Sequence, residues 1–170
     1  MFALAFNMVK YFFLEKNDNT YTTLPHTRTA LTHAMINIHG KPDPHYRYTM
    51  HKLDTVCKRN NKTYFLNLPT VSEELKRNSD EILKWFALTL GVNSNVKEVS
   101  LAGKYETSTL QTHLQTYINT HVLCDICGNP ETIYLPMLKN VLAKKCASCG
   151  GTSIVKVLPK MIKMFVGLSQ

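Results

Sequence analysis

The chain has 170 residues and a mass of 19.4 kDa, which is room for one compact domain or for a small domain with a satellite module. Hydrophobic residues make up 44% of it and charged residues 19%, a balance that excludes wholesale disorder and collagen-like or coiled-coil architecture. The formal net charge of +8 favours a polyanionic partner such as RNA, DNA or an acidic protein face, although a merely basic soluble protein has the same composition.

The most apolar stretch is the start of the chain, residues 1–14, where we expect neither a membrane span nor a secretory signal. Asn7 and Lys10 interrupt the stretch, and it is shorter than the roughly 20 residues that a spanning helix needs. No basic region precedes it and no small-residue cleavage site follows it. We therefore expect a cytoplasmic protein, whose thiols stay reduced and free to bind metal.

The run GKPDP at residues 40–44 predicts a turn or linker, because two prolines around an aspartate cannot continue a helix. We place a boundary there, between an N-terminal extension over 1–44 and the main body. A helix is expected in the extension near residues 27–38. Four apolar residues fall on one face of that helix: Leu31, Ala34, Met35 and Ile38.

Residues 45–121 are expected to form a small α/β domain. Residues 62–68 are typical of a strand, and a helix follows, because Thr70 and Glu73 have the spacing of a capping box. A second helix over 80–90 takes Ser79 as its cap and ends at Gly91. A strand near 96–102 comes next.

The last helix of this domain is expected over about 108–121. Its apolar residues recur at spacings of three and four, which predicts one buried face. These residues are Leu110, Leu114, Tyr117 and Ile118. Alternating helices and strands indicate a small α/β or α+β domain.

The strongest chemical signal is the pattern C-x2-C-x18-C-x2-C, made by Cys124, Cys127, Cys146 and Cys149. Each pair lets a tight turn aim two thiolates at one ion, and two such turns complete a tetrahedron around Zn²⁺. Gly128 and Gly150-Gly151 follow the pairs, where the backbone needs positive φ. Residues between the pairs suit two antiparallel strands. The sequence therefore predicts an α+β fold with a zinc ribbon over 122–158 and a tail over 159–170.

The competing interpretation of the cysteines is a redox dithiol, which needs only one such pair at a helix start. Because all four positions are cysteine, the zinc has no open coordination site and is predicted to be structural. Cys57 is expected to be a small buried hydrophobe. His121 lies beside a filled site and is expected to be a helix-end cation or a solvated side chain. The sequence contains no evident catalytic carboxylate pair, phosphate loop or Ser-His-Asp arrangement, so we expect no active site of its own.

Four motifs resemble the N-terminal domain of the eukaryotic translation initiation factor five family and, more distantly, the beta subunit of initiation factor two. The resemblance covers about residues 45–168. The ribbon alone is common, but its combination with this preceding domain is specific. The matching segments are Tyr46-Arg47-Tyr48-Thr49-Met50, Lys62-Thr63 with Asn67, Lys84-Trp85-Phe86 with Leu90-Gly91, and Val122-Leu123-Cys124 through Asn129-Pro130-Glu131-Thr132.

The resemblance implies roles for individual residues. Arg47 matches a tail arginine that acts on the GTPase of initiation factor two, and Lys62 and Lys84 match two basic residues tied to GTPase activation. The beta-subunit family usually has an apolar residue in place of Lys84 and lacks the tyrosine–arginine motif, so factor five is the better match. The family's tail commonly continues with a basic residue and then proline. This chain has Thr49 and His51 at those places, and Lys52 keeps a positive charge nearby. The candidate binding residues are Tyr46, Tyr48, Lys52, Lys62 and Lys84.

The resemblance implies a factor that binds the initiation factor two GTPase with initiator tRNA, the small ribosomal subunit RNA, or both, and that promotes GTP hydrolysis in trans through Arg47. A guanidinium suits this role because it contacts phosphate oxygens at two points and stays charged. The chain ends soon after the ribbon, so we expect a version without the family's C-terminal helical-repeat domain. Two alternatives stay open: a non-activating mimic or beta-subunit-like binding module that interferes with initiation, and a zinc-ribbon transcription factor.

Overall fold

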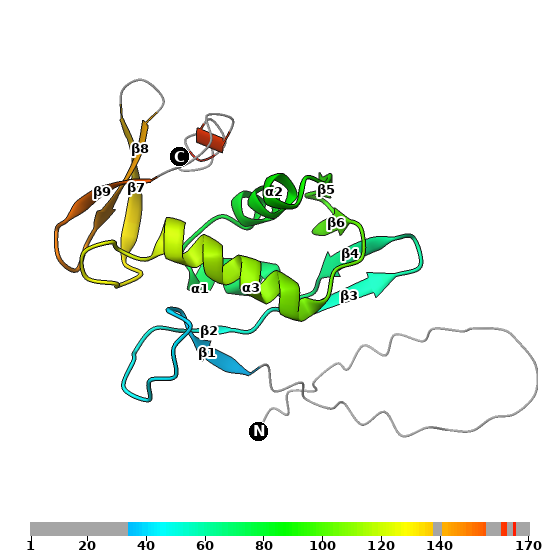
Figure 1. The fold of residues 1–170 in the computed structure, drawn as a ribbon, viewed down its shortest axis with the longest axis horizontal. Helices are drawn as coiled ribbons and strands as arrows, with labels where there is room; N and C mark the ends of the chain where they lie inside the picture. The colour runs from blue at the N-terminus through cyan, green and yellow to red at the C-terminus, as the bar shows by residue number, and fades with distance from the viewer. Residues whose placement is uncertain (1–33, 138–140, 156–160, 163–164, 166–170) are drawn as a thin grey trace, which may run out of the picture. The chain divides into compact units, whose positions relative to one another are not determined.

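The computed structural model describes residues 34–137, 141–155, 161–162 and 165, and residues 32–170 form one compact unit (Figure 1). The fold is α+β, as predicted. The elements in chain order are β1 (Met35–Asn37), β2 (Thr49–His51), β3 (Thr55–Lys58), β4 (Lys62–Phe65), α1 (Leu68–Glu74), α2 (Ser79–Leu90), β5 (Ser94–Asn95), β6 (Ser100–Ala102), α3 (Thr107–Tyr117), a π-helical turn (Ile118–Val122), β7 (Thr132–Met137), β8 (Val141–Cys146) and β9 (Thr152–Val155).

The described strands form three antiparallel sheets. β1 pairs with β2 in a hairpin, and the central sheet has the order β3-β4-β6-β5. The third sheet, β7-β8-β9, is the predicted ribbon with one strand more than the sequence indicated. In Figure 1 the β3–β4 turn lies at the far end of α3 from the ribbon.

The core lies where α2 and α3 pack against the central sheet. The predicted apolar face of the last helix is confirmed, since all four of its residues are fully buried. Trp85 and Phe86 of α2 meet edge to face, with ring centroids 5.5 Å apart, and Trp85 also contacts Tyr117 at 5.3 Å. Such large aromatic side chains contribute much of the buried apolar area of a small domain. They fix α2 against α3, and α3 continues through the π-helical turn into the ribbon.

Two predicted helix starts are wrong in detail. Helix α1 begins at Leu68, and no capping box forms: its N-cap is Asn67, whose side chain makes no cap bond. The Asn67 amide instead donates to the Lys52 carbonyl and accepts from the Asp54 amide, each at 2.8 Å. Helix α2 is capped by Asn78, not Ser79. Its predicted end is confirmed, because Gly91 adopts the left-handed conformation with φ of 67°.

The helix predicted over 27–38 is wrong at its C-terminal end, where residues 35–37 are strand β1. Ile36 pairs with Met50, and the Ile38 amide donates to the Tyr48 carbonyl. Sequence periodicity could not anticipate this pairing, because the partner strand lies beyond the turn at 40–44. The hairpin therefore crosses the expected boundary at residue 44. Residues 27–33 of the expected helix and the apolar start over 1–14 lie outside the described residues.

Cys57 is exposed, contrary to the prediction of a buried hydrophobe. It lies on β3, which is an edge strand of the central sheet, and its thiol contacts the Thr63 hydroxyl at 3.5 Å and the Tyr105 carbonyl at 3.4 Å. Within the described ranges, no helix is long and apolar enough to cross a membrane.

Candidate metal centre and functional residues

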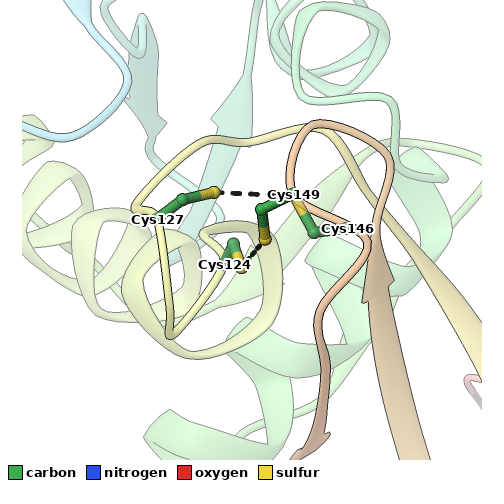
Figure 2. Close-up of side chains that lie close together, drawn as sticks. All are labelled: Cys124, Cys127, Cys146 and Cys149. Atoms are coloured by element: carbon green, nitrogen blue, oxygen red, sulfur yellow. Dashed lines mark hydrogen bonds between the residues drawn. The ribbon is translucent and has the colours of Figure 1, made fainter.

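The four predicted cysteine ligands come together at one end of the ribbon (Figure 2). All four sulfur atoms lie within 4.8 Å of one another. The sulfur of Cys124 is 3.7 Å from that of Cys149, and the sulfur of Cys127 is 3.6 Å from that of Cys146. A tetrahedral Zn²⁺ with bonds of about 2.3 Å places its sulfur ligands about 3.8 Å apart. The thiol cluster therefore has the size that a zinc ion requires.

Two backbone turns of the same design aim these thiols inward. We call residues 124–128 the first knuckle and residues 146–150 the second knuckle. In each, the closing glycine amide donates to the carbonyl of the first cysteine, at 2.9 Å from Gly128 and 3.0 Å from Gly150. Both glycines have positive φ, 73° and 71°, as the sequence predicted.

The environment of the thiols also favours a cation. Burial opposes ionisation of Cys124, but backbone amides and the neighbouring thiols outweigh it and lower the pKa to about 7. The Asn129 amide favours ionisation of Cys127, but partial desolvation and hydrogen bonds to the other three thiols raise its pKa to about 12. Four thiolates at these distances repel one another, and a divalent cation removes that repulsion.

The ribbon is joined to the body by side chains that satisfy the end of the π-helical turn. The backbone carbonyls of Thr120 to Leu123 lie at the end of the helix, where the helix has no later amide to donate to them. Lys144 donates to the Thr120 and Leu123 carbonyls at 2.9 and 2.6 Å. The Thr132 hydroxyl donates to Val122 at 2.6 Å, and Arg77 donates to His121 at 2.9 Å. Two ribbon residues thus complete the last helix of the body.

Arg77 and Glu81 extend this junction from the body side. Arg77 also donates to the carbonyl and hydroxyl of Thr132, at 2.9 and 2.8 Å, and its guanidinium lies 4.5 Å from the Tyr134 ring centre. Glu81 is buried and accepts hydrogen bonds from the hydroxyls of Tyr117 and Tyr134. Burial raises the pKa of Glu81, although both hydroxyls and Arg77 oppose the rise. These buried hydrogen bonds connect the ribbon to the body and fix how the two sit together.

His121 is buried in the same junction, contrary to the prediction of a solvated or helix-end cation. Its ring stacks on Tyr117 and Phe165, with centroids 5.0 and 4.9 Å away. Burial, with Lys144 and Arg77 nearby, lowers its pKa from 6.5 to about 3. The folded chain therefore holds a neutral imidazole.

Mild acid should destabilise the wild-type chain more than a His121→Phe variant. Below pH 6.5 the unfolded chain binds a proton at His121, whereas the folded chain does not until about pH 3, so the free energy of unfolding falls through this window. At pH 5 the loss amounts to about 2 kcal/mol. Urea unfolding at pH 7 and pH 5, in zinc-containing buffer, measures it. An equal loss in both chains would contradict the assignment.

Arg47 is exposed and lies in the segment that connects β1 to β2; we call residues 39–48 of this segment the Arg47 loop. Its guanidinium carbon is 5.1 Å from the centre of the Tyr48 ring. Tyr46 stacks on His39 at 3.8 Å and meets Tyr48 edge to face at 5.6 Å. The Tyr48 hydroxyl donates to Glu131, which follows the first knuckle by three residues. The loop therefore lies against the ribbon and is closed by the β1–β2 hairpin.

The three lysines singled out by the sequence lie on other elements. Lys62 begins β4 and forms an ion pair with Glu98 at 2.9 Å, which raises its pKa. Lys84 is half-buried in the middle of α2, beside a surface hollow lined by Ala87, Leu88 and Val92. Lys52 is exposed and follows β2. No described contact joins Lys62 or Lys84 to Arg47, and the β3–β4 turn is distant from the ribbon in Figure 1.

Three residues that the sequence did not single out for a role prove central. Arg77 and Lys144 join body to ribbon, and Glu131 joins the ribbon to the Arg47 loop. One signal was available for Lys144. Alternation along β8 places Leu142 and Lys144 on the face opposite Ala143 and Lys145, so one lysine had to face inward.

Comparison with known proteins matches residues 39–152 to a family described as the domain found in initiation factors 2B and 5. Eukaryotic translation initiation factor 5 of Dictyostelium discoideum is 33% identical over 139 residues, covering 78% of this chain and 35% of that protein. The same factor of Saccharomyces cerevisiae is 35% identical over 115 residues, covering 64% and 28%. Translation initiation factor 2 subunit beta of Methanosarcina mazei is 28% identical over 92 residues, covering 53% and 45%. The chain thus spans less than half the length of these relatives.

Proposed function

The chain belongs to the translation initiation factor family that is defined by the domain shared by initiation factors 2B and 5, and from this premise we propose that it binds the GTPase subunit of initiation factor two. The complex with GTP and initiator tRNA is the form it acts on, and Arg47 promotes GTP hydrolysis in trans. The sequence motifs favour factor five over the beta subunit, in agreement with the higher identity to factor five.

The exposure of Arg47 is the observation that carries this proposal. The Arg47 loop is held at both sides, by the hairpin and by the Tyr48–Glu131 hydrogen bond, and the arginine side chain is exposed, where another protein can contact it. A group that stabilises charge on a transferring phosphoryl must be placed with little reorganisation. An ordered loop with an exposed guanidinium meets that requirement, and a buried arginine would not.

The turn between β3 and β4 supports a second contact, with ribosomal or transfer RNA. This exposed turn is surrounded by three basic residues, Lys58, Arg59 and Lys62. Glu98 forms an ion pair with Lys62. The Lys58 ammonium lies 4.3 Å from the centre of the Tyr64 ring. Clustered cations at a protruding hairpin suit the phosphate backbone, and such binding weakens steeply as salt is raised.

We propose that the resident metal is Zn²⁺, held by Cys124, Cys127, Cys146 and Cys149. The sulfur distances and the two glycine-closed knuckles support it. With four cysteine ligands the ion has no open position, so its contribution is to fold the ribbon. All the contacts with nucleotide and RNA are assigned to side chains of the protein.

Two measurements on the purified chain test the proposed function. Affinity for the isolated GTPase subunit is measured by titration with the chain. The single-turnover rate of GTP hydrolysis in the complex of that GTPase with initiator tRNA is measured with and without the chain. Binding together with a faster rate is the expected result. Binding without acceleration, with competition against authentic factor five, would show the non-activating mimic instead. Absence of binding would overturn the proposal.

A further inference from the structure

One carboxylate connects the Arg47 loop to the metal end of the ribbon. The Oε1 atom of Glu131 accepts a hydrogen bond from the Tyr48 hydroxyl at 2.7 Å, and its Oε2 atom accepts one from the Ser148 hydroxyl at 2.6 Å. The backbone carbonyl of Glu131 also accepts from the Ala147 amide at 2.8 Å. Ser148 and Ala147 lie between the two cysteines of the second knuckle. Both oxygens of one side chain are thus used, one on each side of the junction.

The rest of the Arg47 loop is ordered by contacts within itself and with β1. The Asn37 amide donates to the carbonyls of Lys41 and Asp43, each at 2.8 Å, and the Asp43 carboxylate accepts from the His45 amide at 2.9 Å. These contacts shape the first half of the loop. Arg47 itself has its described contact with the Tyr48 ring, so its placement follows the placement of Tyr48.

We propose that Glu131 is a positioning residue, which ties the Arg47 loop to the second knuckle and makes the placement of Arg47 depend on a metal-filled ribbon. The second knuckle holds its shape when Cys146 and Cys149 share an ion, and Ser148 then presents its hydroxyl to Glu131. Glu131 in turn holds Tyr48, and Tyr48 lies beneath Arg47. Loss of the metal would release this chain of contacts from the knuckle outward. The catalytic consequence rests on the proposed function, whereas the coupling is a property of this chain alone.

The coupling is tested by hydrogen–deuterium exchange of the amides in residues 39–48, in the full chain with zinc bound and after chelation. Chelation should speed exchange both in the ribbon and in the Arg47 loop. With zinc bound, Glu131→Ala should speed exchange in the loop by about 10- to 100-fold, the factor expected for losing a hydrogen bond to a charged group. Glu131→Gln keeps one acceptor oxygen and should restore part of the protection.

One further variant and its matched control isolate the loop side of the junction. Tyr48→Phe removes the bond on the loop side without touching the ribbon, so its zinc content stays at one ion per chain and its loop still exchanges faster. Tyr64→Phe is the matched control, because it removes a tyrosine hydroxyl whose described partner, Asn60, lies in the β3–β4 turn, and its Arg47 loop should exchange as in the wild type. Should Tyr48→Phe and Glu131→Ala both leave the loop protected with zinc bound, the coupling is overturned. Protection that survives chelation would overturn it as well.

A kinetic measurement connects the coupling to the proposed function. In the hydrolysis assay, Glu131→Ala should lower the maximal rate while the concentration of chain that gives half-maximal stimulation stays nearly constant. A rise in that concentration with an unchanged maximal rate would show a binding contact and overturn the positioning role. If the wild-type chain does not stimulate hydrolysis, the proposed function fails, and the exchange measurement still decides whether the coupling exists.

Discussion

Replacement of Arg47 by alanine should reduce the stimulation of GTP hydrolysis by about 1,000-fold or more, the range that arginines supplied in trans contribute in GTPases. The guanidinium offers two parallel N–H donors to phosphoryl oxygens, and these bonds strengthen as negative charge develops in the transition state. Affinity for the GTPase should change little, because an interaction that forms in the transition state contributes to the rate and not to binding in the ground state. Single-turnover hydrolysis and a separate binding titration distinguish these two effects.

Two further substitutions sharpen this experiment. Arg47→Lys keeps the charge but loses the planar fork, so it should recover only a small part of the stimulation. Lys104→Ala is the matched control, since it also removes one exposed positive charge and should leave the stimulation intact. If Arg47→Ala stimulates hydrolysis as well as the wild type does, the arginine has no catalytic role. If Arg47→Ala and Lys104→Ala lose stimulation equally while Arg47→Lys keeps it, the effect belongs to net charge and not to Arg47.

The features that sequence predicted correctly depend on residues close together in the chain. The knuckles follow from the cysteine spacing, with glycines at Gly128 and Gly150 where positive φ is needed. The end of α2 follows from Gly91, and the buried face of α3 follows from the spacing of its apolar residues. Each of these patterns acts within a few turns of backbone, where local geometry decides the structure.

The features that were missed depend on residues far apart in the chain. Tyr48 and Glu131 are separated by 83 positions and Arg77 and Thr132 by 55. His121 was expected in solvent because nothing near it in the sequence shows that Phe165 covers it. The motif that contains Glu131 pointed to the family, but periodicity and spacing gave no partner for its carboxylate. Tertiary pairing of this kind is set by how the ribbon docks on the body.

Loss of the metal is expected to have the second large effect, and this effect on stability extends beyond the ribbon. Cys146→Ser should abolish stoichiometric zinc binding and unfold the ribbon, because structural zinc sites supply folding free energy of roughly 10 kcal/mol or more in small domains. Cys146 is buried at the start of the second knuckle. Lys144 and Thr132 would then release the carbonyls at the end of the π-helical turn, so the last helix of the body should fray too. We expect the melting temperature to fall by about 10 °C or more.

Cys57→Ser is the matched control for this substitution, because Cys57 is an exposed cysteine outside the four-thiol cluster. It should keep one zinc per chain by native mass spectrometry and melt close to the wild type. A redox dithiol predicts a different pair of results: no zinc in the purified chain, and a disulfide that forms on oxidation and breaks on reduction. The sulfur pairs 3.7 and 3.6 Å apart join different knuckles, Cys124 with Cys149 and Cys127 with Cys146. If the purified wild-type chain lacks zinc and still has a folded ribbon, the metal assignment is overturned. The dependence of Arg47 on the second knuckle is then overturned with it.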